Sequence, residues 1–332
     1  MSTKAGDYPL VGQTALFTTH IGYRRTRHPA CPSGKLVGMT ELTLGNASNV
    51  AARAHQLAEA AAVSAGVTVR TISTPDELSD AYELYKDTWR PDASNLSMTL
   101  GILRVLAKTG NYVSGAYVGS KLVGMSVGFC GRPDQRSLHS HITGVSSSMR
   151  GRKVGQAIKL HQRAWALETS MRTITWTVDP LVRRNAFFNI VKLGAFPTEY
   201  LPNFYGQMDD AINGSDVSDR LLITWDLESE IVGSVGPGSS EHEWPLPETP
   251  ELIVTDADDH PHVSAAPQSA LVAVATPDDI ESLRRTHPGA ARAWRSVVRE
   301  CFMSEFASGS RVVGIDSRGS YIFDRKGTSQ NG

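Results

Sequence analysis

Cysteine is scarce in this chain of 332 residues, and its three cysteines suggest neither a disulfide framework nor a metal site. Cys31, Cys130 and Cys301 lie far apart, and no Cys-x-x-Cys pair occurs. Cysteines that are odd in number and widely spaced are typical of reduced thiols, which are more often buried in a core than catalytic. We therefore expect a cytoplasmic protein that holds no metal.

Long apolar runs and an excess of one charge are also missing. No run approaches the roughly 20 apolar residues of a membrane span, and the N-terminus has no basic-then-apolar signal pattern. The 33 Lys and Arg nearly balance the 34 Asp and Glu, for a net charge of −1. This balance gives no broad attraction to nucleic acid or to a membrane surface, so we expect neither as a partner. A homodimer is compatible with the composition.

Residues 1–66 are interpreted as an N-terminal extension. Residues 36–44 are compatible with a strand, and the alanine-rich stretch 46–65 favours a helix that ends at Gly66. A basic cluster precedes them and comprises Arg24, Arg25, Arg27, His28 and Lys35. Such a cluster is usually a solvated loop, and binding of a phosphate or a partner is the alternative.

The stretch 67–228 predicts an α/β core with a mixed sheet. Its strongest helix start is Thr74-Pro-Asp-Glu77, where a capping threonine, a proline at the first helical position and a capping-box glutamate coincide. The turn Gly119-Ser120-Lys121 predicts a hairpin. The expected strands are 67–72, 111–118, 122–129, 137–145, 173–178, 204–208 and 221–227, and the expected helices are 74–89, 96–108, 154–169 and 184–193.

The composition changes after residue 228. Residues 229–251 are rich in Gly, Pro, Ser and Glu, which predicts a linker or a long surface loop. Residues 252–332 predict a C-terminal α/β subdomain that packs on the core. In it, Thr276-Pro-Asp-Asp279 repeats the chemistry of a helix start, 290–307 favour a second helix, and 311–315 pair with 321–324 as a hairpin.

The most informative stretch runs from Val145 to Ala157, where a basic, glycine-bearing turn joins a strand to an amphipathic helix. The unpaired N–H groups of a helix start and the helix dipole both favour an anion at such a turn. Arg150, Arg152 and Lys153 add positive charge there. The stretch therefore predicts a pyrophosphate site, although turns of this kind also occur without a ligand.

This order of elements, with the Arg150–Gly155 turn at its centre, resembles the GNAT superfamily of acyl-CoA-dependent N-acyltransferases. The phosphate loop of that family has the pattern Arg/Gln-x-x-Gly-x-Gly/Ala, and Lys153 stands here in place of the first glycine. One branch is similar at Trp176–Leu181, Arg184–Asn189, Lys192–Ala195, Asn203–Gly206, Ser218–Arg220 and Ala293–Arg299. The resemblance covers most of 67–324 and implies a GNAT acyl-CoA N-acyltransferase fold with a C-terminal α/β extension.

The resemblance implies that acetyl-CoA or another acyl-CoA is the co-substrate. Its pantetheine arm would pair with the backbone of Gly144, Val145 and Ser146, and an N–H near Val145 would face the thioester oxygen. Asn185 and Asn189 share a helix face and would touch the arm, or one of them would cap the helix end. The residues expected to hold the pyrophosphate are Arg150, Gly151, Arg152, Lys153, Val154, Gly155 and Gln156.

His139 and His141 are the candidate general bases. Residues two apart on a strand share a face, and a histidine accepts a proton near pH 7. The alternative is that both are hydrogen-bonded side chains of a buried sheet face. Many family members use a tyrosine as the general acid, four residues before the glycine that ends the later helix. Ile190 occupies that position here. Tyr205 is the substitute candidate, with packing on the sheet as its alternative.

Arg220 and Asp179 are the candidate substrate-binding residues. Arg220 would hold an acceptor carboxylate through two parallel hydrogen bonds, or it would pair with Asp216 or Asp219. Asp179 would hold the acceptor amine, or it would form the turn that ends its strand.

The sequence thus predicts transfer of an acetyl or succinyl group to the amine of a small molecule, such as an amino acid. Direct transfer in a ternary complex is expected, because no well-placed nucleophile indicates a covalent route. Lys153 and the missing tyrosine leave a non-catalytic CoA-binding sensor or partner-binding module as the alternative. The near-neutral charge argues against a third function, an enzyme acting on nucleic acid through the basic cluster at 24–35.

Overall fold

The computed structural model describes residues 37–91, 98–206, 217–234, 249–256, 260–264 and 268–325. The chain divides into two units, 1–43 and 44–332. Of the first unit, the structure describes the beginning of helix α1 (Val37–Ala65). The basic cluster at 24–35 and Asp216 lie outside the described residues.

A seven-stranded mixed sheet forms the centre of the second unit, and its order is β1-β2-β3-β4-β5-β7-β6. Neighbouring strands are antiparallel except β4 and β5, which are parallel. The predicted α/β class with a mixed sheet is confirmed. The strands are β1 (Thr68–Thr71), β2 (Tyr112–Val118), β3 (Lys121–Cys130), β4 (Ser137–Val145), β5 (Thr173–Val178), β6 (Phe196–Leu201) and β7 (Arg220–Asp226).

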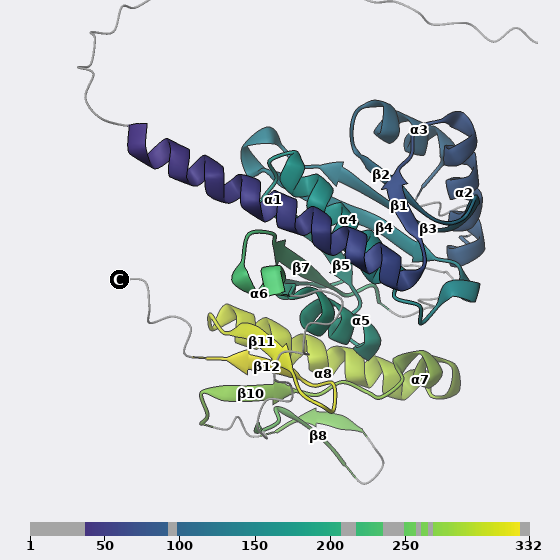
Figure 1. Ribbon diagram of the computed structural model, residues 1–332. Helices are drawn as coiled ribbons and strands as arrows, with labels where there is room; N and C mark the ends of the chain where they lie inside the picture. The colour runs from purple at the N-terminus through teal and green to yellow at the C-terminus, as the bar shows by residue number, and fades with distance from the viewer. Residues whose placement is uncertain are drawn as a thin grey trace, which may run out of the picture. The chain divides into compact units, whose positions relative to one another are not determined.

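Helices cover both faces of the sheet (Figure 1). Helices α2 (Pro75–Trp89) and α3 (Leu100–Lys108) share an apolar cluster with β2, β3 and β4. Helix α4 (Val154–Glu168) and the alanines of α1 pack in a second cluster. The predicted capping box of α2 is present, since Thr74 Oγ1 accepts from Glu77 N. Helix α3 begins at Leu100, later than predicted, because Thr99 caps it.

Two strand predictions were wrong. The described part of 36–44 belongs to helix α1. Once an α-helix has started, each added residue forms one more backbone hydrogen bond, which favours extension of the helix. The described part of the strand placed at 204–208 is also wrong, since Asn203–Tyr205 form a turn and β6 is the last described strand before β7; residues 207 and 208 lie outside the described residues. Pro197 argues against a strand interior, but β6 is an edge strand with a bulge, where a proline is tolerated.

The segment after β5 is only partly an ordinary helix. Helix α5 (Arg183–Phe187) continues as a π-helix (Phe188–Lys192), where a single α-helix over 184–193 was predicted. Gly194 ends the segment with φ +66°, a left-handed conformation that favours glycine.

The C-terminal region forms an α/β extension, as predicted. Within the expected linker at 229–251, the structure describes a short helix, α6 (Glu230–Ser234), which buries Val232. The next elements are β8 (Ile253–Thr255), β9 (Pro261–Val263), β10 (Leu271–Val274), α7 (Ile280–Thr286), α8 (Pro288–Ala307), β11 (Arg311–Ile315) and β12 (Tyr321–Asp324). Strands β11 and β12 pair as the predicted hairpin, within a sheet of order β10-β12-β11.

The predicted helix start at Thr276 needs a correction. The residue that caps α7 is Asp279, whose side chain accepts from Ser282 N. The Thr276 hydroxyl instead accepts from Arg183 Nε of the core and donates to Gly319 O. Thr276 therefore connects the extension to the core.

Helix α8 also attaches the extension to the core through Phe302, which is fully buried. Its ring lies 5.6 Å from that of Tyr200 on β6 and 5.0 Å from those of Tyr321 and Phe323 on β12. The aromatic cluster therefore spans the main sheet and the C-terminal sheet.

We predict that Phe302→Ala lowers the free energy of unfolding by about 3–5 kcal/mol, because it opens a cavity among packed rings. Urea unfolding measures this loss. The neighbouring Met303 is 46% exposed, so Met303→Ala is the control and should cost less than about 1 kcal/mol. Equal losses in the two variants would contradict the role given to Phe302.

Candidate functional site

Strands β4 and β5 pair only at their beginning. The parallel pairs are Ser137 with Thr173, Leu138 with Ile174 and His139 with Thr175. Beyond the last pair β4 continues to Val145 and β5 to Val178. The backbone of β4 from Ser140 onward therefore has no partner on β5, and an extended ligand could pair with it.

A β-bulge in β4 lies where the two strands separate. Gly128 of β3 is opposite Ser140 and Val127 is opposite Ile142, so His141 is the extra residue. The bulge shifts the alternation of side chains between the two faces. His139 before it and Ile142 after it both lie on the face that carries α2 and α3, whereas Ser140 contacts α4.

The face of β4 and β5 that carries the histidines is polar and half-buried. His139 Nδ1 lies 3.1 Å from Thr175 Oγ1, and the ring of Phe129 contacts the rings of His139 and His141. Further along β5, Thr177 Oγ1 lies 2.8 Å from the hydroxyl of Tyr205. The predicted catalytic side chains thus contact two strands that flank β4: Phe129 of β3 contacts both histidines, and the threonines of β5 contact His139 and Tyr205.

Electrostatics favours the neutral form of His139. Burial lowers its pKa, and the charges of His141 and Lys159 lower it further. A histidine whose pKa is lowered is unprotonated at neutral pH, and the unprotonated ring is the form that can accept a proton.

The turn between β4 and α4 presents a helix start without a side-chain cap. Among the described residues no side chain caps the start of α4, and its first turn holds no acidic residue. Arg150, Gly151, Arg152 and Lys153 are exposed around it. A Cβ placed on Gly155 would meet no atom within 4 Å, so the surface at the helix start is open. An anionic group such as a diphosphate fits this arrangement of donors, dipole and charge.

Lys153 has a left-handed backbone conformation, which accounts for the glycine at this position in the GNAT phosphate-loop pattern. Its φ of +61° and ψ of 11° are left-handed, at a cost of roughly 1–2 kcal/mol for a residue with a Cβ. The backbone nevertheless keeps the turn, and the Lys153 side chain is exposed beside the helix start. The lysine therefore adds charge to the turn without filling it.

The two candidate asparagines differ in their surroundings. Asn189 is buried, and its Oδ1 accepts a hydrogen bond of 3.2 Å from Trp176 Nε1. Asn185 is half-buried on α5, and its backbone N donates to Val182 O. Asn189 thus has a hydrogen-bond partner inside the protein. Asn185 is therefore the better candidate of the two for contact with a ligand. Ile190 is buried in the core.

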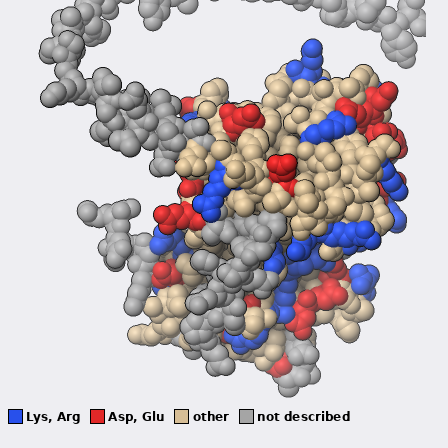
Figure 2. Space-filling view, in the orientation of Figure 1, with Lys and Arg blue, Asp and Glu red and all other residues tan. Residues whose placement is uncertain are grey.

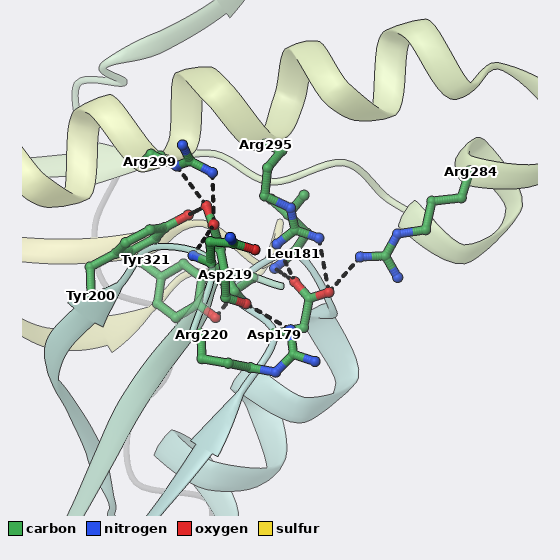
Figure 3. Close-up of polar contacts among 11 residues, drawn as sticks. Asp179, Leu181, Tyr200, Asp219, Arg220, Arg284, Arg295, Arg299 and Tyr321 are labelled. Atoms are coloured by element: carbon green, nitrogen blue, oxygen red, sulfur yellow. Dashed lines mark hydrogen bonds and ion pairs between the residues drawn. The ribbon is translucent and has the colours of Figure 1, made fainter. Parts of the chain in front are cut away.

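Asp179, a candidate for the acceptor amine, is engaged by the C-terminal extension (Figure 3). Arg295 of α8 donates to both of its carboxylate oxygens, at 2.7 and 3.0 Å, and Arg284 and the backbone N of Leu181 also donate to it. Burial alone would raise the pKa of Asp179, but these two arginines hold it well below its ordinary range. This carboxylate therefore joins the end of β5 to the extension, which corrects the substrate role.

A second buried carboxylate, Asp219, was not singled out in the sequence as a site. Arg299 donates to both of its oxygens, at 2.7 and 2.8 Å, and the hydroxyl of Tyr200 donates to Oδ2. Figure 3 shows Arg295 and Arg299 reaching from α8 to the two different aspartates. Residues one helical turn apart share a helix face, so the spacing of Arg295 and Arg299 is the signal in the sequence from which this arrangement follows.

Arg220 lies between these aspartates and the histidine face. It is buried, its Nη1 donates to the carbonyl of Asp219 at 2.8 Å, and its guanidinium carbon lies 5.2 Å from the ring centre of Tyr205. Burial lowers its pKa, while the charge of Asp179 opposes that shift. Arg220 therefore bonds the backbone carbonyl of Asp219, whereas the Asp219 carboxylate pairs with Arg299.

Lys159 of α4 was missed altogether, because a lysine between Ile158 and Leu160 is typical of the solvent face of an amphipathic helix. It is 4% exposed. Its Nζ donates to Ser140 Oγ at 3.1 Å and to Gln162 Oε1 at 2.9 Å, and it lies 3.6 Å from the ring centre of Trp176.

No family model matches the chain, and no curated protein matches it significantly. Solved structures do. They include a ribosomal-protein-alanine N-acetyltransferase from Brucella melitensis (16% identity, TM-score 0.41, 99% of that chain), an N-acetyltransferase from Staphylococcus aureus Mu50 (14%, 0.40, 98%) and an acetyltransferase of the GNAT family from Streptococcus pneumoniae (12%, 0.38, 97%). Each match covers 48% of this chain.

At these identities and TM-scores, the similarity to the solved acetyltransferases does not establish an activity for this chain. Charged side chains of both signs adjoin on the face shown in Figure 2. In the described part of the chain, no helix is long and apolar enough to cross a membrane.

We predict that Asp179→Asn lowers the free energy of unfolding by about 3–5 kcal/mol, because it leaves the buried Arg295 without its counter-charge. The pKa of Asp179 is depressed in the folded protein, so its contribution is present above about pH 4 and is lost as the pH falls further. Urea unfolding of both proteins at several pH values measures the difference.

The control is Asp278→Asn, because Asp278 pairs with Arg183 but is 93% exposed. An exposed pair contributes at most about 1 kcal/mol. A loss in Asp179→Asn no larger than in this control, or one that persists unchanged at pH 3, would refute the assignment.

Proposed function

We propose that this protein is an acyl-CoA-dependent N-acyltransferase that transfers an acetyl or succinyl group to the amine of a small molecule. The observation that carries the proposal is the loss of pairing between β4 and β5 beyond His139 and Thr175, beside the uncapped start of α4. A single extended, anionic ligand could therefore contact both the free edge of β4 and the start of α4.

The donor would bind through backbone groups. Its diphosphate would accept from the N–H groups of Val154, Gly155 and Gln156, which have no partner inside the helix. Its pantetheine arm would pair with β4 over Gly144–Ser146, and an N–H of the same edge would face the thioester oxygen as that oxygen gains charge. Asn185 would contact the arm from α5.

Transfer would proceed directly between the two bound substrates. The acceptor amine would attack the thioester carbon from the face that carries the histidines, and His139, neutral at pH 7, would accept its proton directly or through water. The carbon–nitrogen bond would form, and the carbon–sulfur bond would then break with release of the CoA thiolate. Tyr205 lies on the same face and is the candidate to protonate that thiolate.

Arg220 is the residue that would bind the carboxylate of an acceptor such as an amino acid. It is held against the ring of Tyr205 at the β7 end of the histidine face. A guanidinium recognises a carboxylate through two parallel hydrogen bonds.

We predict that Gly155→Asp weakens binding of acyl-CoA by tenfold or more. The new side chain enters open space at the helix start, and its negative charge interacts favourably with the helix dipole, so the fold is kept. The same charge repels a diphosphate. Isothermal titration with acetyl-CoA and succinyl-CoA measures the affinities. The matched control is Gly289→Asp, an equally open position in the first turn of α8, which should leave both affinities unaltered. Failure of the wild-type protein to bind any acyl-CoA would refute the proposal.

We predict that the double substitution His139→Ala and His141→Ala lowers turnover by roughly 10²–10⁴-fold, the contribution of a positioned general base. Turnover is measured as release of free CoA thiol over a matrix of acyl donors and amine acceptors. Affinity for the donor serves as the control, since the donor is held mainly by the backbone. Wild-type turnover in the double variant would remove both histidines from the mechanism, and donor binding without thiol release across the matrix would favour a CoA-binding sensor.

A further inference from the structure

Lys159 is a buried amine whose contacts in the described part of the chain are all neutral. Its contacts are the hydroxyl of Ser140, the amide oxygen of Gln162 and the ring of Trp176. Among the described residues no carboxylate pairs with it, and burial moves its pKa well below the ordinary value. A protonated lysine in such surroundings lacks a counter-charge, which is costly unless a ligand supplies one.

The position of this amine relates it to the separated strands. Ser140 and Trp176 directly follow His139 and Thr175, the last residues at which β4 and β5 pair. The Nζ atom of Lys159 contacts both of them and therefore lies at the closed end of the gap between the strands. A donor with its diphosphate at the start of α4 and its arm along β4 directs its acyl group toward this end.

The amine is held there by a buried network. Gln162 accepts from Lys159 and donates to Ser126 Oγ at 3.4 Å, and Ser126 Oγ lies 2.9 Å from Thr143 Oγ1. These residues come from α4, β3 and β4, so the lysine is fixed against the strand that would hold the donor.

We propose that Lys159 selects acyl donors whose acyl chain ends in a carboxylate. This inference rests on the proposed function and narrows its donor. A terminal carboxylate at the closed end would accept a charge-assisted hydrogen bond from the protonated amine, with the extra proton taken from solvent, and would supply the missing counter-charge. An acyl chain that ends in a methyl group offers neither interaction and leaves the amine with its neutral partners.

The test compares donors of equal chain length with and without the carboxylate. Isothermal titration gives the dissociation constants of malonyl- and propionyl-CoA, succinyl- and butyryl-CoA, and glutaryl- and valeryl-CoA for the wild-type protein, and no acceptor is needed. We expect at least one carboxylate donor to bind tenfold or more tightly than its matched partner. The pair with the largest ratio gives the chain length that reaches Lys159.

Lys159→Met tests the residue itself, because methionine has a similar length without the charge. We expect it to reduce that ratio to within about threefold of one, and Lys159→Arg to restore part of it. Lys153→Met is the matched control: it removes a charge beside the diphosphate, so it should weaken both members of a pair alike and preserve the ratio.

The outcomes separate this inference from the proposed function. Equal affinities in every matched pair, or a ratio that survives in Lys159→Met, overturn the selectivity and leave the acyltransferase proposal standing. Absence of binding by all six donors overturns both. Equal affinities in the wild-type comparison overturn the inference even if a Lys159 variant does not fold.

Discussion

The early end of pairing between β4 and β5 is the constraint on which the rest of the site depends. Three parallel pairs hold the strands together, and the bulge at His141 then turns β4 away. Backbone groups that would otherwise be satisfied inside the sheet are left for a ligand. Because β4 leads directly into the turn before α4, the start of this helix, which has no side-chain cap, lies next to that strand edge.

The bulge also determines which residues face each other. Without an extra residue, His139 and Gly144 would lie on opposite faces; with it, both lie toward α2, where a Cβ on Gly144 would meet Trp89. Lys159 contacts the other face of the same short stretch through Ser140. His139 and the buried amine of Lys159 are therefore on opposite sides of one strand, close to the same gap.

Local chemistry in the sequence was sufficient for the features that depend on neighbours in the chain. The capping box at Thr74, the C-terminal hairpin and the basic turn after β4 are of this kind, and all three are present. The partner of Asp179 is 116 residues away, and nothing near Asp179 in the sequence indicates Arg295. The burial of Lys159 also escaped prediction, because helical periodicity places a lysine on the solvent face unless packing is known.

The C-terminal extension and the core share their buried charges, so neither region is electrostatically complete alone. Asp179 and Asp219 come from the ends of two core strands, whereas Arg295 and Arg299 come from α8. Removing the extension would leave two buried carboxylates without their arginines. Since Arg220 bonds the carbonyl of Asp219, the position of Arg220 depends on this charge balance as well.

The edge strand β6 has a consequence for how copies of this chain can associate. Pro197 has no N–H to donate, and the bulge between Pro197 and Glu199 interrupts the regular spacing of the strand. The row of outward-facing donors and acceptors that a strand from another molecule would need is thus broken near its middle. Joining two sheets edge to edge along β6 is disfavoured by this backbone, so a homodimer built on this fold would have to use a different surface.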